Sequence, residues 1–100
     1  MNKAEWLVPV DHPVFAGHFP GRPIMPGVVL LDRAIQFVAA ALGRSTSDCT
    51  IANAKFLSPV GPGETLTFSW QARPSGSIDF AISAAGRAVA TGTLSLPNAS

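Results

Sequence analysis

The residues best suited to chemistry lie close together in the sequence, between His18 and Asp32. An imidazole can remove a proton near neutral pH, and a carboxylic acid can deliver one if its surroundings keep it protonated. Between them, Gly27 has no side chain to block access to its backbone N–H, which could polarise a carbonyl oxygen. A base, an acid and an oxyanion donor that converge on one point suit proton abstraction next to a carbonyl group.

Each of these residues also has a plain structural explanation. A single loop histidine is usually a surface residue, and Asp32 could form a structural hydrogen bond with Gln36, one helical turn later. However, Asp32 and Gln36 share a helix face with Leu31 and Ile35. Burying a carboxylate there is costly unless it is hydrogen-bonded or protonated. We therefore expect Asp32 to be buried, and the general-acid role and the structural role both stay open at this point.

The loop before this helix is expected to be stiff and extended. Residues 11–26 contain four prolines, each of which fixes a φ angle and disfavours helix in the residue before it: Pro13, Pro20, Pro23 and Pro26. The loop runs directly into the helix that carries Asp32, so its stiffness would hold His18 in register with Gly27.

A helix is predicted from Gly27, with a proline before its start and Gly43 just past its end. It is apolar almost all the way round, so we expect other elements to enclose it. Its apolar residues are Val28, Val29, Leu30, Leu31, Ala34, Ile35, Phe37, Val38 and Leu42.

Strands are predicted on both sides of this helix. The first, interrupted by Pro9, suits an edge strand or the end of a strand, and the last three form an antiparallel meander. The segments are 4–10, 50–60, 64–72, 77–85 and 87–96. Apolar and polar residues alternate in 65–70 and at 78, 80 and 82, which predicts one apolar face. The fold class is therefore α+β, in one domain over residues 1–100, with a curved sheet of about five strands around a long central helix.

The composition limits the classes of function. Charged residues make up 13% of the chain, about half of the roughly 25% that is typical, so we expect an apolar face buried in a homo-oligomer. The net charge of +1 and the lack of a basic stripe give no support to nucleic-acid binding. The sequence shows neither an apolar targeting segment nor a membrane span, which predicts a cytoplasmic protein.

Cys49 is the single cysteine, so an internal disulfide and a multi-cysteine metal site are excluded. We expect Cys49 to be a small, partly buried thiol, and we expect no metal and no cofactor.

The segment GHFPGRPIMPGVVLLDRAIQ, residues 17–36, resembles the signature of the β-hydroxyacyl-acyl carrier protein dehydratases of the FabZ and FabA type, which have the hot-dog fold. HFPG, PIMPGV and a glutamine four residues after the acid all stand in place. A weaker likeness continues through AKFLSPVGPGETLTFSW, so that the resemblance covers most of residues 12–72.

The resemblance implies dehydration of 3-hydroxyacyl-acyl carrier protein to the trans-2-enoyl product, in fatty-acid or specialised lipid biosynthesis. His18 falls on the histidine that removes the C2 proton, and Asp32 falls on the acid that helps the C3 hydroxyl leave as water. Gly27 falls on the glycine whose amide binds the thioester carbonyl, and Gln36 on a residue that orients the acid. In the family, the histidine and the acid of one site come from different subunits of a dimer whose sheets join edge to edge.

Two features depart from the general pattern of the family. The acid is an aspartate, as in the dehydratase-isomerase branch, where the general branch has glutamate. HFPGRPIMPG nevertheless resembles the general branch, so isomerisation is not predicted. The compact chain is similar to the small, ApeI-like dehydratases of aryl-polyene and related lipid pathways.

The remaining expectations concern substrate binding and partners. The acyl chain is expected in a tunnel lined by Phe37, Phe56, Leu66 and Phe68, although most of these could simply be core. Acyl carrier proteins are acidic, so the candidates to receive them are Arg22, Arg33, Lys55 and Arg73. The expected assembly is a dimer or a trimer of dimers. A hot-dog thioesterase and a non-catalytic subunit that pairs with an active partner are the alternatives.

Overall fold

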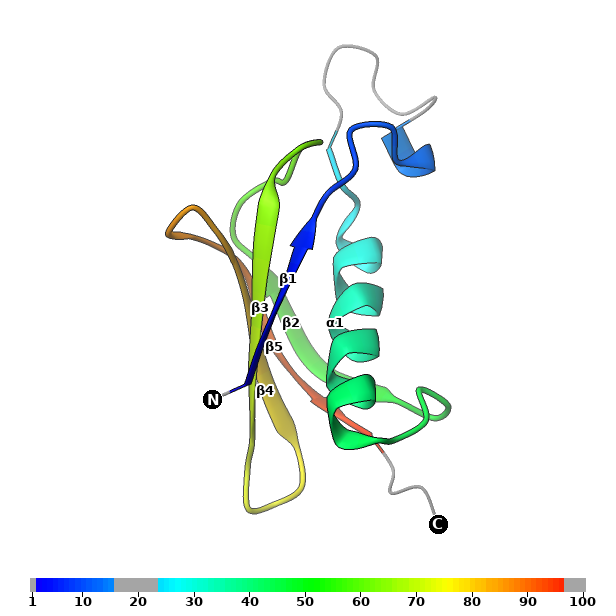
Figure 1. Cartoon of the computed structure of the whole chain (residues 1–100). Helices are drawn as coiled ribbons and strands as arrows, with labels where there is room; N and C mark the ends of the chain where they lie inside the picture. Colours follow the sequence, from blue (N-terminus) through cyan, green and yellow to red (C-terminus); the bar gives the residue numbers. More distant parts are fainter. Residues whose placement is uncertain (1, 16–23, 97–100) are drawn as a thin grey trace.

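The chain forms a curved antiparallel sheet with one long helix on its concave face (Figure 1). The structure is a computed structural model, and it describes residues 2–15 and 24–96. Its elements are β1 (Asn2–Leu7), a short 3-10 helix (Pro13–Phe15), α1 (Gly27–Leu42), β2 (Thr50–Phe56), β3 (Thr65–Ala72), β4 (Ile78–Ala84) and β5 (Arg87–Ser95). The predicted α+β architecture is confirmed.

The helix has the predicted bounds, and its ends explain them. Pro26 precedes the first turn in an extended conformation, with φ −62° and ψ 144°, which suits a proline at this position. Gly43 ends the helix with φ 64°, a left-handed conformation that favours glycine. The N–H of Arg44 then donates to the carbonyl oxygen of Ala39 at 3.0 Å.

The five strands follow the order β1-β3-β4-β5-β2, and every neighbouring pair is antiparallel. The expected meander of the last three strands and the edge position of the first strand are both confirmed. The strand that follows the helix, β2, pairs with β5 and forms the other edge. Because α1 brings the chain back along the sheet before β2 starts, β2 ends near the N-terminus of α1 (Figure 1).

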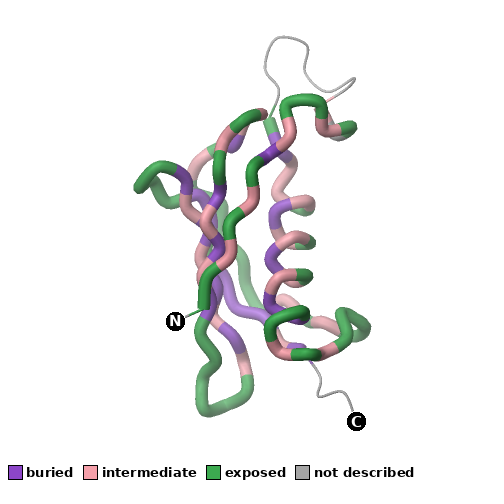
Figure 2. Tube along the Cα trace, viewed as in Figure 1, coloured by how far each residue is buried: buried purple, intermediate pink, exposed green. Residues whose placement is uncertain are grey.

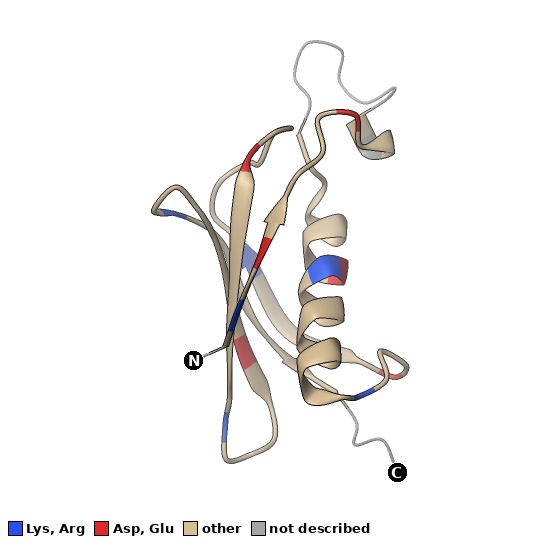
Figure 3. Cartoon of the chain, in the orientation of Figure 1, with Lys and Arg blue, Asp and Glu red and all other residues tan. Residues whose placement is uncertain are grey.

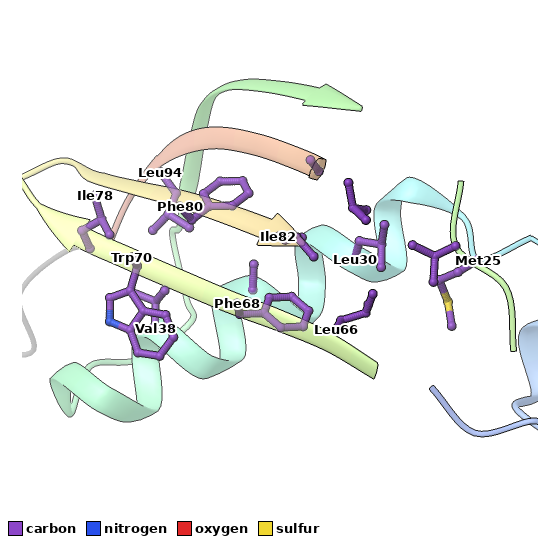
Figure 4. Close-up of a cluster of buried hydrophobic side chains, with 14 of the residues drawn as sticks. Met25, Leu30, Val38, Leu66, Phe68, Trp70, Ile78, Phe80, Ile82 and Leu94 are labelled. Atoms are coloured by element: carbon purple, nitrogen blue, oxygen red, sulfur yellow. The ribbon is translucent and has the colours of Figure 1, made fainter. Parts of the chain in front are cut away.

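The core lies between α1 and the concave face of the sheet (Figure 4). Leu66, Phe68 and Trp70 point to this face from alternate positions of β3, as the period of two predicts. Met25 and Leu30 lie at one end of the cluster, and Val38 and Trp70 lie at the other (Figure 4). Full burial of an apolar side chain of this size contributes about 1.5–3 kcal/mol, so this layer dominates the stability of the fold.

The prediction that other elements enclose the helix on all sides is wrong for the single chain. The sheet covers one stripe of α1, which holds the buried residues Leu30, Ala34, Val38 and Ala39. On the far side, Val28 is 71% exposed, and the turns that face away from the sheet are exposed (Figure 2). Five strands curve along one side of the helix and leave its outer stripe uncovered.

Gly92 of β5 sits where two neighbouring strands come close to its backbone. A Cβ atom at this position would lie 2.5 Å from the carbonyl oxygen of Asn53 and 2.6 Å from the ring of Phe80. The contact with Asn53 is to backbone, so it cannot be relieved by a side-chain rotation.

We predict that Gly92→Ala lowers the free energy of unfolding by about 1–3 kcal/mol, because the added methyl group forces β2 and β5 apart. Urea denaturation followed by circular dichroism would measure the change. Thr91→Ala, at the exposed neighbouring position, is the control and is expected to stay within about 0.5 kcal/mol of wild type. Equal denaturation midpoints for wild type and Gly92→Ala would contradict the prediction.

Candidate active site

An apolar cleft of about 570 Å³ opens at the N-terminus of α1. One wall is the segment that leads into the helix together with its first turn, and the other is the segment that follows β2. The lining residues are Ile24, Met25, Gly27, Val28, Leu30, Phe56, Leu57, Ser58, Pro59 and Val60. A cleft of this size and lining suits an apolar ligand with one polar group.

At Gly27 the helix backbone lies against the ring of Phe56, at the end of β2. A Cβ atom there would lie 2.6 Å from Cζ of Phe56, so the glycine lets the Phe56 ring lie against the helix backbone. Gly27 is also the first residue of α1, and Pro26 provides no side-chain cap. The first N–H groups of a helix have no partner within it and carry the positive end of the helix dipole. This end of α1 is therefore suited to hold a carbonyl oxygen in the cleft.

Asp32 and Gln36 form a hydrogen-bonded pair on the outer stripe of α1. Nε2 of Gln36 donates to Oδ2 of Asp32 at 2.6 Å, as the spacing of four residues suggests. Both side chains are exposed, so the prediction of a buried Asp32 is wrong for the single chain. The physical reason is that the sheet packs against the opposite stripe of the helix, the one with Leu30 and Ala34.

The predicted tunnel residues do not gather around the cleft. Phe56 lines it, but Leu66 and Phe68 are buried in the core. The ring of Phe37 packs against that of Phe68, with 5.1 Å between the ring centroids. In the single chain these three residues are therefore core, and the apolar surface available to a ligand is that of the cleft.

The predicted basic residues have different surroundings. Arg33 follows Asp32 in α1, and its guanidinium carbon lies 4.4 Å from the centroid of the Trp6 ring, a cation–π contact. Lys55 is exposed on β2, one residue before Phe56. His18 and Arg22 lie outside the described residues.

Arg73 lies at the opposite end of the sheet from the cleft, in the turn between β3 and β4 (Figure 1). Its Nε atom is 2.7 Å from Oδ2 of Asp79, and this hydrogen bond, with a second from Thr93, holds the pKa of Asp79 below its usual range. The geometry gives no support to the prediction that Arg73 binds a carrier protein at the cleft. Figure 3 shows how few charged residues the rest of the fold carries.

Sequence reasoning missed an arginine that contacts the wall of the cleft. Nη2 of Arg87 donates to the carbonyl oxygen of Pro59 at 2.8 Å and lies 2.9 Å from Oε1 of Glu64. The hydrogen bond from the N–H of Gly61 is the main cause that lowers the pKa of Glu64, and the hydrogen bond and charge of Arg87 lower it further. The sequence predicted a break between the strands at 77–85 and 87–96, but it gave no sign that the turn there meets the segment after β2.

A cluster of rings precedes the segment that contains His18. The His12 ring makes edge contacts with Trp6 and with Phe15, each with 6.1 Å between ring centroids. Because Arg33 lies over the same Trp6 ring, these contacts tie the segment at residues 12–15 to α1.

The other residues add no further chemistry to the cleft. Cys49 is partly buried, as predicted, and burial raises the pKa of its thiol. Within residues 2–15 and 24–96, no group of three His, Cys, Asp or Glu side chains is placed to hold a metal ion. None of the helices described has the length and apolar character that a membrane span requires.

Two solved structures are similar to the chain over almost its full length. One is a protein from Erwinia carotovora subsp. atroseptica, with a TM-score of 0.79 and 29% identity, covering 95% of this chain and 81% of that chain. The other is the dehydratase heterocomplex ApeI:P from Xenorhabdus doucetiae, with a TM-score of 0.79 and 21% identity, covering 96% of this chain and 86% of that chain. The hot-dog fold expected from the sequence is therefore confirmed.

Sequence relatives indicate the same family. A curated protein of Wolbachia sp. subsp. Drosophila simulans (strain wRi), the 3-hydroxyacyl-[acyl-carrier-protein] dehydratase FabZ, is 46% identical over 71 residues, which are 64% of this chain and 50% of that protein. The chain spans about half the length of the curated relatives it matches. The model of the ApeI-like family, described as ApeI dehydratase, matches residues 2–93, from the first strand of the sheet into the last, and the chain therefore belongs to the ApeI-like dehydratase family.

Proposed function

We propose that this chain removes water from 3-hydroxyacyl-acyl carrier protein and forms the trans-2-enoyl thioester, in fatty-acid or specialised lipid biosynthesis. The observation that carries the proposal is an apolar cleft that ends at Gly27, on the same helix that presents the paired Asp32 and Gln36. The names of the curated relatives support the same reaction.

The proposed reaction moves two protons. His18 takes a proton from C2, and the negative charge that develops on the thioester oxygen is held by the N–H of Gly27. Asp32 then gives its proton to the C3 hydroxyl, so that the C3–O bond breaks, water leaves and a C2=C3 double bond forms. A preorganised donor at the oxyanion is worth roughly 3–4 kcal/mol of transition-state stabilisation.

Gln36 serves this reaction by fixing the carboxyl group of Asp32. Its hydrogen bond occupies Oδ2, which leaves Oδ1 to carry the proton towards the substrate. A general acid also needs surroundings that favour its protonated form, and solvent exposure does not provide them. We therefore infer that a second copy of the chain covers Asp32 and that each site is shared between two subunits.

The exposed apolar surface around the cleft supports this assembly. Val28 is 71% exposed, Phe56 50%, Leu57 47% and Ile24 38%, and all four line the cleft. Residues of this kind gathered on one surface are typical of an interface. The edge strand β2 ends at Phe56, so a second copy that pairs along β2 would also cover this rim.

The first test is incubation of the purified protein with 3-hydroxyacyl-acyl carrier protein, followed by mass spectrometry of the carrier. We expect loss of one water from the acyl chain, and we expect His18→Ala and Asp32→Asn to lower the rate about 100-fold or more, since each removes a proton-transfer group.

Two other results would contradict this function. Release of free carrier thiol would identify a thioesterase, in which water attacks the thioester carbonyl. Intact substrate with a folded, pure protein would favour a non-catalytic subunit that needs a different partner.

A shared site predicts complementation between two inactive variants. In a dimer of one His18→Ala subunit and one Asp32→Asn subunit, one site has lost both groups and the other has both intact. We expect co-expressed, doubly tagged mixed dimers to regain roughly half of the wild-type activity per dimer. A mixed dimer as inactive as its parents would place both groups of a site in one chain.

Delivery by an acidic carrier protein predicts an effect of charge near the cleft. We propose Arg22, Arg33 and Lys55 for this role, since the last two lie on the elements that carry Asp32 and Phe56. Arg33→Glu combined with Lys55→Glu should raise the KM for the carrier-bound substrate about fivefold or more, because exposed charge pairs each contribute up to ~1 kcal/mol.

The matched measurement uses the same acyl group on coenzyme A, for which KM should change less than twofold. Arg44→Glu, beyond the opposite end of α1, is the control variant and should behave like wild type with both substrates. Equal losses on the carrier and on coenzyme A would count against a carrier-binding role.

A further inference from the structure

The turn between β4 and β5 places Arg87 next to the cleft wall. The two strands are joined through Ala85 and Gly86, with φ values of 50° and 80°. Two successive positive φ angles are typical of a tight two-residue hairpin, whose twist matches that of the strands. Because the turn is so short, Arg87 is the first residue of β5 and lies beside the segment that follows β2.

The guanidinium of Arg87 contacts three separate groups of that segment. Nη2 donates to the carbonyl oxygen of Pro59 at 2.8 Å and lies 2.9 Å from Oε1 of Glu64. Nε donates to Oγ of Ser58 at 3.2 Å. A planar group with five donors can hold several acceptors at fixed angles, which a lysine ammonium cannot reproduce.

The acceptors are themselves fixed by a second set of hydrogen bonds. Oε2 of Glu64 accepts the N–H of Gly61 at 2.8 Å, and the hydroxyl of Ser58 donates to the carbonyl oxygen of Ala88 at 2.7 Å. Residues 58–64 are therefore folded around the guanidinium of Arg87, whose side chain is 40% exposed. We name this set of contacts the Arg87 clamp.

The clamp is connected to the helix terminus by one hydrogen bond. The N–H of Met25 donates to the carbonyl oxygen of Val60 at 2.7 Å, and both side chains are buried. Met25 is two residues before Gly27. The position of Val60 is set by its neighbours in the clamp, so the clamp fixes both the cleft wall and the approach to Gly27.

We propose that Arg87 is a positioning residue of the active site, which holds the cleft wall and the N–H of Gly27 in register with the bound thioester. This inference rests on the proposed dehydratase activity. A shift of about 1 Å in a group that stabilises the transition state can cost ~100-fold in rate. Arg87 does not line the cleft itself; it acts through Ser58 and Pro59, which it holds by hydrogen bonds and which do line the cleft.

The test compares Arg87→Met with Asp79→Asn in the assembled enzyme. Asp79→Asn disrupts a second arginine–carboxylate pair among the described residues, at the hairpin on the opposite end of the sheet, so it matches the loss of an ion pair without touching the cleft. We expect Arg87→Met to lower kcat about tenfold or more with less than a threefold change in KM. Asp79→Asn should keep kcat within twofold of wild type.

A second readout does not depend on activity. Amide hydrogen exchange should become faster in Arg87→Met at the N–H groups of Met25, Leu57 and Gly61, and it should stay unchanged there in Asp79→Asn. This measurement remains informative if the purified chain shows no dehydration, so a failed function and a failed clamp are distinguishable.

Two further variants keep the proposal falsifiable if Arg87→Met does not fold. Ser58→Ala removes one contact of the clamp and should lower kcat about threefold. Glu64→Gln should be less stable than wild type at neutral pH. Because the pKa of Glu64 is lowered in the folded state, this difference should be complete above the usual carboxyl pKa and should disappear as the pH falls through the lowered value.

Equal kcat values for wild type and Arg87→Met would overturn the proposal. So would equal losses in Arg87→Met and Asp79→Asn, since these would show a general effect of stability. Unchanged exchange at Met25 and Gly61 would separate the clamp from the helix terminus and would also overturn it.

Discussion

The packing of one stripe of α1 against the concave face of the sheet is the contact on which the rest of the structure depends. Leu30, Ala34 and Val38 supply the helix side of that contact, and alternate residues of β3, β4 and β5 supply the sheet side. Because this stripe is fixed by burial, the rotation of α1 about its axis is fixed as well. Asp32 and Gln36 therefore have to face outward, away from the sheet, and any group that reacts with Asp32 has to approach from that side.

The same contact explains why the cleft forms at one end of the helix. At the C-terminal end, Val38 and Ala39 are buried and belong to the main core, where Figure 4 shows Val38 beside Trp70. At the N-terminal end, the absence of a side chain at Gly27 lets Phe56 approach the backbone, and Val28 points away from the sheet. This end therefore combines an apolar surface with backbone N–H groups that have no partner within the helix, a combination that suits the proposed thioester substrate with its hydrocarbon chain.

Most of the fold could be predicted because it depends on local patterns. The period of two in β3, the proline before α1 and Gly43 after it each specify a conformation within a few residues. The exposure of Asp32 could not be predicted, because an apolar helix does not reveal how much of its circumference a sheet of five strands covers. The candidate site was predicted from His18, Gly27 and Asp32, which lie in one continuous segment, and the structure describes a cleft beside Gly27. Arg87 was missed because its contacts join residues more than twenty positions apart.

The antiparallel topology then determines which of these distant segments can share a site. The strands β2 and β4 both end at the end of the sheet where α1 begins, and β3 and β5 both start there. The segment after β2 and the turn before β5 are therefore neighbours at the cleft, whereas the turn with Arg73 is at the opposite end of the sheet. Arg73 and Arg87 each adjoin a hairpin turn, but of these two turns the one before Arg87 contacts the cleft wall, which is why we propose the positioning role for Arg87. The two-residue turn fixes the backbone of Arg87, so its guanidinium stays within hydrogen-bonding distance of Pro59 and Glu64. After a longer loop, the guanidinium would be free to bond to water instead.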